Sequence, residues 1–297
     1  MKIATHNFKF HADDVFAVAA LFILLGKENC TVHRTRDIEE INSADFAVDV
    51  GDVYNPEQNR FDHHQEGGAE DRQNGIPYAS FGLVWKAYGE KISGSKEASD
   101  VIDRILVQPI DAGDNGFSTF TRTVENVSPG LLGDVISLYR PTLKEPEDWD
   151  KRFLEAVDWA MWIIQREVKI QKDNTEVEKR IIEVYENSKN KKIIIFDKAD
   201  AFDREITTRI LFNFTEPIYA VLYRPNHDNW QIVAVSKERG SFETRKPFPE
   251  PWRAKTDEQF DLASGINGGV FCHKSGFMCV AKNFEAALEL AEKSLNA

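Results

Sequence analysis

Cysteine is scarce in this chain. Its 297 residues include three cysteines, Cys30, Cys272 and Cys279, and no two of them form a Cys-x-x-Cys pair. Disulfide frameworks need an even set of thiols, and cysteine zinc sites need closely spaced pairs. We therefore expect neither a disulfide framework nor a zinc site built from cysteines.

Long apolar runs are also missing. No segment comes near the roughly 18 consecutive apolar residues of a membrane-spanning helix. The N-terminal residues lack the basic and then apolar layout of a signal peptide. The sequence predicts a cytoplasmic protein with no membrane partner.

Basic residues are fewer than acidic ones. The chain has 37 Lys and Arg residues against 49 Asp and Glu residues, which gives a formal net charge of −12. Such a protein is not expected to bind duplexes through a broad basic face, although a local groove or a bound metal could still attract phosphate.

Glycine and proline are absent from residues 147–216. The first part of this stretch repeats apolar side chains at helical spacing, and the pattern continues less regularly to Tyr185. A long helix is predicted, and the sequence leaves open whether it is broken once near Asp173. Because 297 residues suffice for two domains, we place them at residues 1–188, which include the helix, and 189–297.

Short β-prone runs alternate with helical patterns in the N-terminal half. We expect strands at residues 2–5, 30–34 and 46–48, with a buried helix at 15–25 and a short one at 37–42. This alternation predicts an α/β domain with a mostly parallel sheet. In the C-terminal half, the pattern predicts a smaller α/β domain with a strand at 193–196, a hairpin at 218–235, two short strands at 270–272 and 277–281, and a final helix capped by Asn283.

Polar residues gather where these strands should end or in the adjoining loops. They form four clusters: His6 with His11 and Asp13; Asp49 with Asp52; Asp62 with His63 and His64; and Asp111 with Asp114. Ligands of open α/β sheets bind at the carboxyl ends of strands, and crowded carboxylates and imidazoles are costly unless a cation lies among them. This predicts a divalent metal site, and the mixed ligands suit manganese, iron or zinc better than calcium or magnesium. Two ions about 3.5–4 Å apart, bridged by a carboxylate, suit in-line attack at phosphorus.

Each cluster also has an ordinary interpretation. A single histidine such as His6 is more often a loop residue than a ligand, Asp49 could cap a turn, and Asp111 with Asp114 could be loop carboxylates, since Asp favours turns. The adjacent histidines at 63 and 64 are less common by chance. The four clusters together favour a metal site.

These residues resemble a known family. Phe61-Asp62-His63-His64, with His6, Asp13 and Asp49 upstream and Asp111 downstream, resembles the DHH phosphoesterase superfamily. Within it, the melanocyte proliferating gene family is similar over essentially the whole chain, at Thr5-His6-Asn7, Phe10-His11-Ala12-Asp13-Asp14, Val48-Asp49-Val50-Gly51 and Phe271-Cys272-His273-Lys274-Ser275-Gly276-Phe277. The resemblance implies a Rossmann-like N-terminal domain with two divalent ions, usually manganese, and a smaller C-terminal domain that closes over the substrate. Eukaryotic members of the closer family are described as 3′–5′ RNA exonucleases.

The resemblance also implies roles for single residues. The first ion would be held by His6, His11 and Asp49, and the second by Asp13, Asp49, His63 and Asp111. His64 would face the substrate phosphate or the leaving group, and Asp62 would orient a histidine. The superfamily usually has an aspartate where this chain has His11, and the added imidazole favours a later transition metal. We expect two divalent ions, manganese first, with magnesium, iron and zinc as alternatives.

Candidate substrate-binding residues lie near the C-terminus. Gly268-Gly269 alone is a turn signal, but with His273 it resembles the glycine-rich substrate loop of DHH proteins, where backbone amides approach phosphate. Arg245 and Arg253 belong to a basic and aromatic patch. That patch is either solvated surface or a site that pairs phosphates and stacks a base.

The function predicted from the sequence is a metal-dependent phosphodiesterase, an exonuclease that hydrolyses short single-stranded RNA or small nucleotides by a two-metal mechanism. One alternative is a phosphoanhydride hydrolase that resembles the inorganic pyrophosphatases of the superfamily. Another is a metal-stabilised binding protein without activity, although a structural zinc site needs only four ligands and this chain offers more. The choice between RNA and DNA, the cleavage polarity, the native ion and homo-oligomerisation are left open.

Overall fold

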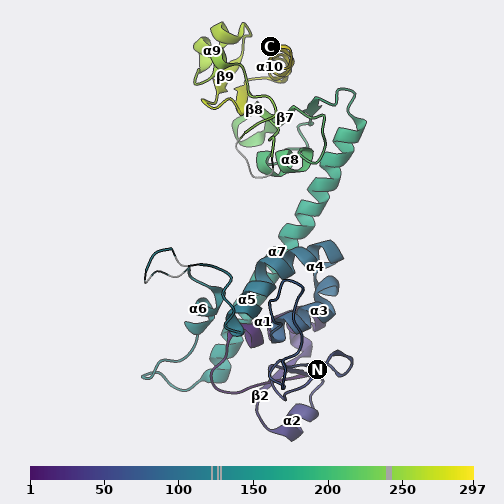
Figure 1. Ribbon diagram of the computed structural model, residues 1–297, viewed down its shortest axis with the longest axis vertical. Helices are drawn as coiled ribbons and strands as arrows, with labels where there is room; N and C mark the ends of the chain where they lie inside the picture. Colours follow the sequence, from purple (N-terminus) through teal and green to yellow (C-terminus); the bar gives the residue numbers. More distant parts are fainter. Residues whose placement is uncertain (122, 126, 128, 239–242) are drawn as a thin grey trace. The chain divides into compact units, whose positions relative to one another are not determined.

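Two compact units make up the chain, Met1–Lys172 and Asp173–Ala297, each with its own five-stranded sheet. The computed structural model describes residues 1–121, 123–125, 127, 129–238 and 243–297. The units divide inside α7 (Trp149–Asn187), a single helix of 39 residues without a break at Asp173 (Figure 1). The boundary expected at residue 188 lies just beyond the end of the same helix. Among the described residues, no helix combines the length and apolar character needed to cross a membrane.

The sheet of the first unit has the strand order β2-β1-β3-β5-β4. Neighbouring strands from β2 to β5 run parallel, and β4 runs antiparallel to β5 at the edge. The predicted α/β class with a mostly parallel sheet is therefore confirmed. The antiparallel pair of β4 and β5 was not expected, because each strand has only two residues and lies within a polar loop. The bounds are β1 (Lys2–Thr5), β2 (Thr31–Arg34), β3 (Phe46–Val48), β4 (Tyr54–Asn55) and β5 (Arg60–Phe61).

The helix α1 (Ala12–Leu25) lies at the centre of the first unit. Its residues from Ala12 to Phe22 are all buried, because it packs on the sheet and against α3 (Ser80–Ser93) and α5 (Gln108–Asp114). It ends at Gly26, whose φ of 85° suits glycine. The predicted buried helix is confirmed, with one additional turn at its start. The remaining helices of this unit are α2 (Ile38–Asn42), α4 (Lys96–Ile102) and α6 (Leu132–Ser137).

The segment around Asp111 differs from the sequence-based expectation. The sequence left open that Asp111 and Asp114 are loop carboxylates, and this is wrong, since both lie on α5. A π-helical turn, Asp103–Val107, precedes Pro109. Proline lacks the amide proton of a regular helix, and a wider turn just before it accommodates that loss.

The second unit has a mixed sheet in the order β6-β7-β8-β10-β9. Only β6 and β7 are parallel, and the other pairs are antiparallel. The helix α10 packs on one face, and α8 packs on β7 and β8 from the other. The bounds are β6 (Ile193–Ile195), β7 (Tyr219–Arg224), β8 (Asn229–Ala234), β9 (Gly269–Cys272), β10 (Met278–Ala281), α8 (Arg204–Leu211), α9 (Asp257–Ser264) and α10 (Phe284–Asn296).

Several expectations for this unit are confirmed. The β7–β8 hairpin and the β9 and β10 strands lie where they were predicted, and Asn283 caps α10 by accepting a hydrogen bond from the Ala286 amide at 2.9 Å. The helices α8 and α9 were not predicted, because each is only eight residues long.

Candidate metal centre

Three neighbouring parallel strands bring polar residues to one edge of the first sheet. His6 directly follows β1, Asp49 follows β3, and Asp62 follows β5. Because the carboxyl ends of parallel strands meet at the same edge, these side chains converge. Asp49 has a left-handed backbone with φ 55°, a conformation that aspartate adopts more readily than most residues. The strand-end position expected for Asp49 is confirmed.

The start of α1 supplies the opposite wall. His11 is the N-cap residue, and Asp13 and Asp14 are fully buried in the first turn. One Asp14 oxygen accepts the His11 amide hydrogen bond at 2.8 Å. The partial positive charge of a helix N-terminus favours carboxylates at this place.

His6 links the strand ends to this helix. Its Nε2 atom lies 3.2 Å from Asp14 Oδ2 and 3.2 Å from Asp49 Oδ2. Burial alone would lower the pKa of the imidazole, but hydrogen bonds and attraction from the two carboxylates outweigh it and raise the pKa to about 10. A site without metal therefore holds a proton on His6 at neutral pH.

His63 contacts the same cluster from the end of β5. Its Nε2 atom lies 3.4 Å from Asp49 Oδ1, 3.2 Å from Asp114 Oδ2 and 3.7 Å from Asp13 Oδ2. Burial again opposes the charged form, but Asp114 and Asp49 raise the pKa of His63 to about 10. Asp49 thus lies between two imidazoles. Burial would raise the pKa of its carboxyl, yet His6 and His63 hold that pKa far below the usual value.

The donor set fits a divalent cation. Asp13 is completely buried, and neither of its carboxylate oxygens accepts a hydrogen bond from the described residues. Burial raises the pKa of Asp13, and the neighbouring carboxylates raise it further. A buried carboxylate that accepts no hydrogen bond is costly, and a metal ion removes that cost. Three groups have ligand atoms within 4.8 Å of one another: His6, His11 and Asp49; Asp49, His63 and His64; and His11, Asp13 and Asp114.

Asp114, rather than Asp111, joins this cluster. Asp111 Oδ2 lies 2.7 Å from Arg72 Nη2, and Asp111 Oδ1 accepts the Gly82 amide hydrogen bond at 3.0 Å. Burial raises the pKa of Asp111 to about 7 against the pull of Arg72. Among the described residues, Asp111 belongs to none of the three candidate groups. The sequence pattern could not separate the two aspartates, because both lie on α5 only three residues apart.

Asp62 supports the loop that carries the two histidines. Its Oδ1 atom accepts hydrogen bonds from the His63 and His64 amides at 2.7 and 3.1 Å, and lies 2.8 Å from His64 Nδ1. Its Oδ2 atom accepts the Asp52 amide at 2.7 Å. The bond to Asp62 raises the pKa of His64, whose side chain is 56% exposed. Asp62 therefore holds the Nδ1 side of the His64 ring, and the other side of the ring is open to solvent.

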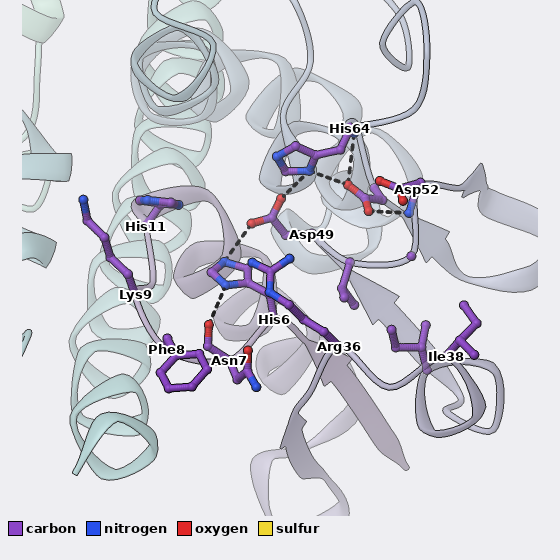
Figure 2. A pocket seen from close by; sticks show the side chains of 14 residues that line it. His6, Asn7, Phe8, Lys9, His11, Arg36, Ile38, Asp49, Asp52 and His64 are labelled. Atoms are coloured by element: carbon purple, nitrogen blue, oxygen red, sulfur yellow. Dashed lines mark hydrogen bonds and ion pairs between the residues drawn. The ribbon is translucent and has the colours of Figure 1, made fainter. Parts of the chain in front are cut away.

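A pocket of about 490 Å³ opens onto the cluster. His6, His11, Asp49 and His64 line it, and Phe8, Lys9, Arg36 and Ile38 lie around it (Figure 2). Lys9 and Arg36 are exposed, and neither forms an ion pair with a described residue. Phe8 is 62% exposed and has a φ of 61°. These rim residues were not identified from the sequence, because isolated aromatic and basic residues in a loop carry no pattern.

The glycines predicted to bind substrate make hydrogen bonds and packing contacts within the second unit. Gly268 and Gly269 donate their amide hydrogen bonds to Asp261 at 3.2 and 2.7 Å. A Cβ atom on Gly269 would lie 2.5 Å from Phe260 Cδ1, so close packing on α9 requires a glycine there. The amides are thus not free for phosphate, and the substrate role of the two glycines stays a prediction without support from this geometry.

The other three predicted substrate residues are partly buried in the same unit. Arg245 donates to the carbonyls of Pro217 and Phe212, both at 2.8 Å, and Arg253 donates to the Phe248 carbonyl at 2.9 Å. His273 Nδ1 lies 2.8 Å from Ser275 Oγ. The two arginines thus hold loops in place, and a role in substrate binding stays a prediction for all three.

Comparison with known proteins identifies the same family from a family model and from single relatives, over nearly the whole chain. The family model described as "Uncharacterised protein family (UPF0160)", with the name MYG1_exonuc, matches residues 2–295. The "MYG1 exonuclease" of Rattus norvegicus is 31% identical over 99% of this chain and 84% of its own length. The "MYG1 protein" of Dictyostelium discoideum is 31% identical over 100% of this chain and 97% of its own length. The comparisons support the predicted family but do not extend to the DHH superfamily, and on this basis the chain belongs to the MYG1 family.

Proposed function

We propose that this chain is a metal-dependent phosphodiesterase that acts as a 3′–5′ exonuclease on short single-stranded RNA. The observation that carries the proposal is the buried cluster around Asp49, in which neither Asp13 carboxylate oxygen accepts a hydrogen bond from a described residue and which faces a pocket. The rat relative is named an exonuclease, which agrees with hydrolysis of a phosphodiester.

Two sets of side chains would hold divalent ions, of which we expect manganese. His6, His11 and Asp49 would form the first set, and Asp13, Asp114 and His63 would form the second, with Asp49 shared. Bound there, such ions supply Lewis acidity and activate water for attack at phosphorus. The buried carboxylates would contribute the negative charge that retains such ions, and the sheet edge and α1 hold these side chains in place.

His64 is the residue that we assign to proton transfer. Asp62 accepts a hydrogen bond from Nδ1, which leaves Nε2 of this exposed ring able to reach a substrate oxygen. The hydrogen bond to Asp62 raises the pKa of His64, which favours the imidazolium. An imidazolium in this place can protonate the leaving oxygen or stabilise charge on the phosphate.

The rim of the pocket fits a single strand of nucleic acid. Lys9 and Arg36, which form no ion pair with a described residue, offer cations for backbone phosphates, and the exposed Phe8 ring offers a stacking surface for one base. Stacking on an aromatic side chain requires an unpaired base. Recognition through three local residues also agrees with a net charge of −12, which disfavours wide contact with a duplex.

A turnover assay tests the proposal. End-labelled RNA and DNA oligonucleotides, dinucleotides and pyrophosphate are incubated with the manganese-loaded protein, and products are resolved by length. We expect nucleoside monophosphates released from the 3′ end of RNA. Asp49→Asn should abolish the release, whereas Asp71→Asn, an exposed aspartate of the same unit, should not change it. Preferred turnover of pyrophosphate, or metal binding without any turnover, would contradict the proposal and favour a phosphoanhydride hydrolase or a non-catalytic binding protein.

A further inference from the structure

Two of the three cysteines lie directly opposite each other in the second unit. Cys272 is the last residue of β9, and its partner in the register of the sheet is Cys279 on the antiparallel strand β10. Opposed residues of an antiparallel pair point to the same face of the sheet. Both side chains are completely buried in the same apolar core, and both thiols are free. The number of cysteines excluded a disulfide framework, but the fold brings these two thiols together.

The hydrogen bonds of the strand give the spacing of this pair. The Cys272 amide donates to the Lys255 carbonyl at 3.0 Å, and the Cys272 carbonyl accepts from the Ala254 amide at 3.0 Å. Its backbone polar groups thus point away from β10, so Cys272 and Cys279 form a non-hydrogen-bonded pair. The Cα atoms of such a pair lie about 4.5 Å apart, and a disulfide requires about 4.4–6.8 Å. The two strands therefore already hold the cysteines at the spacing of a disulfide.

The two thiols differ in reactivity. The hydrogen bond with Cys279 lowers the pKa of the Cys272 thiol against the effect of burial, and the charge of Arg253 lowers it as well. Burial raises the pKa of Cys279. Because the thiolate is the form that reacts with oxidants, Cys272 is the nucleophile of the pair and Cys279 is the resolving thiol.

The position of β9 gives a small oxidant access to the pair. This strand has four residues and lies at the edge of its sheet. On its outer side it is joined to residues 254–256 by single hydrogen bonds and an isolated bridge, and not by another strand. Short elements at an edge open locally at a lower free energy than the whole domain. Such an opening exposes Cys272 while the rest of the unit stays folded.

We propose that Cys272 and Cys279 form a reversible disulfide when the protein meets hydrogen peroxide. The Cys272 thiolate attacks one peroxide oxygen, the O–O bond breaks, and a sulfenic acid forms at Sγ. The hydroxide that leaves takes up the proton of the Cys272 thiol and becomes water. The Cys279 sulfur then attacks the sulfenic sulfur, so that the S–S bond forms, the S–O bond breaks, and the hydroxyl leaves as water with the Cys279 proton. The two sulfurs lose two electrons, which reduce the peroxide to two water molecules.

This disulfide would join the edge strand β9 to β10 and close a ring around the turn that carries His273. Peptide mass mapping of the full chain after peroxide treatment tests its formation. Trypsin cleaves after Lys274, between the two cysteines, so the two halves of the hairpin should be recovered as one linked pair that dithiothreitol separates. The linked pair should be lighter by two hydrogen atoms than the two reduced peptides together.

Single substitutions identify the thiols that react. Cys272→Ala and Cys279→Ala should each prevent the linkage. Cys30→Ala, which removes the partly exposed cysteine of the first unit, should leave it intact and is the matched control. Recovery of Cys272 and Cys279 from the oxidised parent as thiols, or as separate sulfinic acids, would overturn the proposal without recourse to any variant.

Thermal melting tests the effect on the fold. A link across β9 and β10 restricts the unfolded chain, so the oxidised parent should melt about 3 °C or more above the reduced one. Dithiothreitol should restore the lower melting temperature, and Cys30→Ala should show the same shift. A linked form that melts below the reduced form would mean that the disulfide distorts the hairpin, and would contradict the spacing argued for the pair.

Discussion

The His64 side chain of the metal cluster is 56% exposed, and its orientation depends on Asp62. We expect His64→Ala to lower kcat by about 10²-fold or more, because the substrate oxygen loses a proton donor or a stabilising charge. Manganese content should stay near that of the parent. Steady-state kinetics and metal analysis of the purified variant check both expectations.

His33→Ala provides the matched control, since His33 is an exposed histidine on β2 outside the cluster. Its kinetics should equal those of the parent. Loss of metal from His64→Ala would show that His64 is a ligand, in agreement with its membership of one candidate group, and would contradict the assigned proton transfer.

Phe8 combines an exposed ring with a strained backbone. Its φ of 61° is unfavourable for a bulky residue, and the buried Arg34 guanidinium maintains it by donating to the Phe8 carbonyl at 2.6 Å. Strain of this kind is common at functional sites. We expect Phe8→Gly to stabilise the fold by about 1 kcal/mol, and to raise KM for RNA about tenfold through lost base stacking.

Melting curves and kinetics on two substrates test the Phe8 prediction. The second substrate is the same RNA with an abasic 3′-terminal residue, for which Phe8→Gly should have little effect on KM. If the variant is more stable but binds both substrates as the parent does, the ring does not stack a base.

At the scale of elements, α3 and α5 depend on a glycine for their contact. A Cβ atom on Gly82 would lie 1.8 Å from Asp111 Oδ2, so alanine there would displace the carboxylate from Arg72. We expect Gly82→Ala to destabilise the protein by about 3 kcal/mol, because it overpacks the contact and breaks a buried ion pair. Chemical denaturation measures the change.

Gly113→Ala is the corresponding control on α5. A Cβ atom on Gly113 would meet no described atom within 4 Å, and alanine is a better helix former. This variant should gain about 0.5–1 kcal/mol. Equal effects of the two substitutions would show that the Asp111 contact does not depend on Gly82.

Elements with a long or regular pattern were predictable from the sequence. The apolar run of α1 and the helical stripe of α7 determine their own structure, because each repeats over several turns. The strands β4 and β5 have two residues each and are defined by their pairing partners. The start of α5 contains Pro109, whose effect is absorbed by the preceding π turn. The structure of β4, β5 and the start of α5 therefore depends on contacts with other segments and not on a local sequence pattern.

The candidate site was also predictable only in part, namely for the residues that lie close to strand ends. His6 and Asp49 directly follow β1 and β3, and His63 is two residues beyond β5, so their convergence follows from the parallel order of these strands. The distinction between Asp111 and Asp114 depends on Arg72, which lies far away in sequence. The use of the Gly268 and Gly269 amides by Asp261 likewise depends on the packing of α9. Neither contact leaves a local sequence signal.

For the molecule as a whole, the metal cluster links ion binding to pH. In the protein without metal, the pKa values of His6 and His63 are about 10, against 6.5 for a free histidine. Their protonated forms stabilise the folded chain below about pH 6.5, and this contribution is lost as the pH rises through 10. Asp49 carries no proton at neutral pH, because its pKa is lowered.

Metal ions bind neutral imidazole, so loading must release the protons on His6 and His63. At pH 7.5 we expect net proton release when manganese binds, and an affinity that rises by up to about tenfold per pH unit for each proton displaced. Calorimetry in two buffers of different ionisation enthalpy counts the protons. His63→Gln should reduce the count, whereas the exposed His33→Ala should leave it unchanged. A manganese affinity that is constant from pH 7 to 8.5 would mean that these imidazoles are not ligands, and the ion would then have to be held by the carboxylates of Asp13, Asp49 and Asp114 alone.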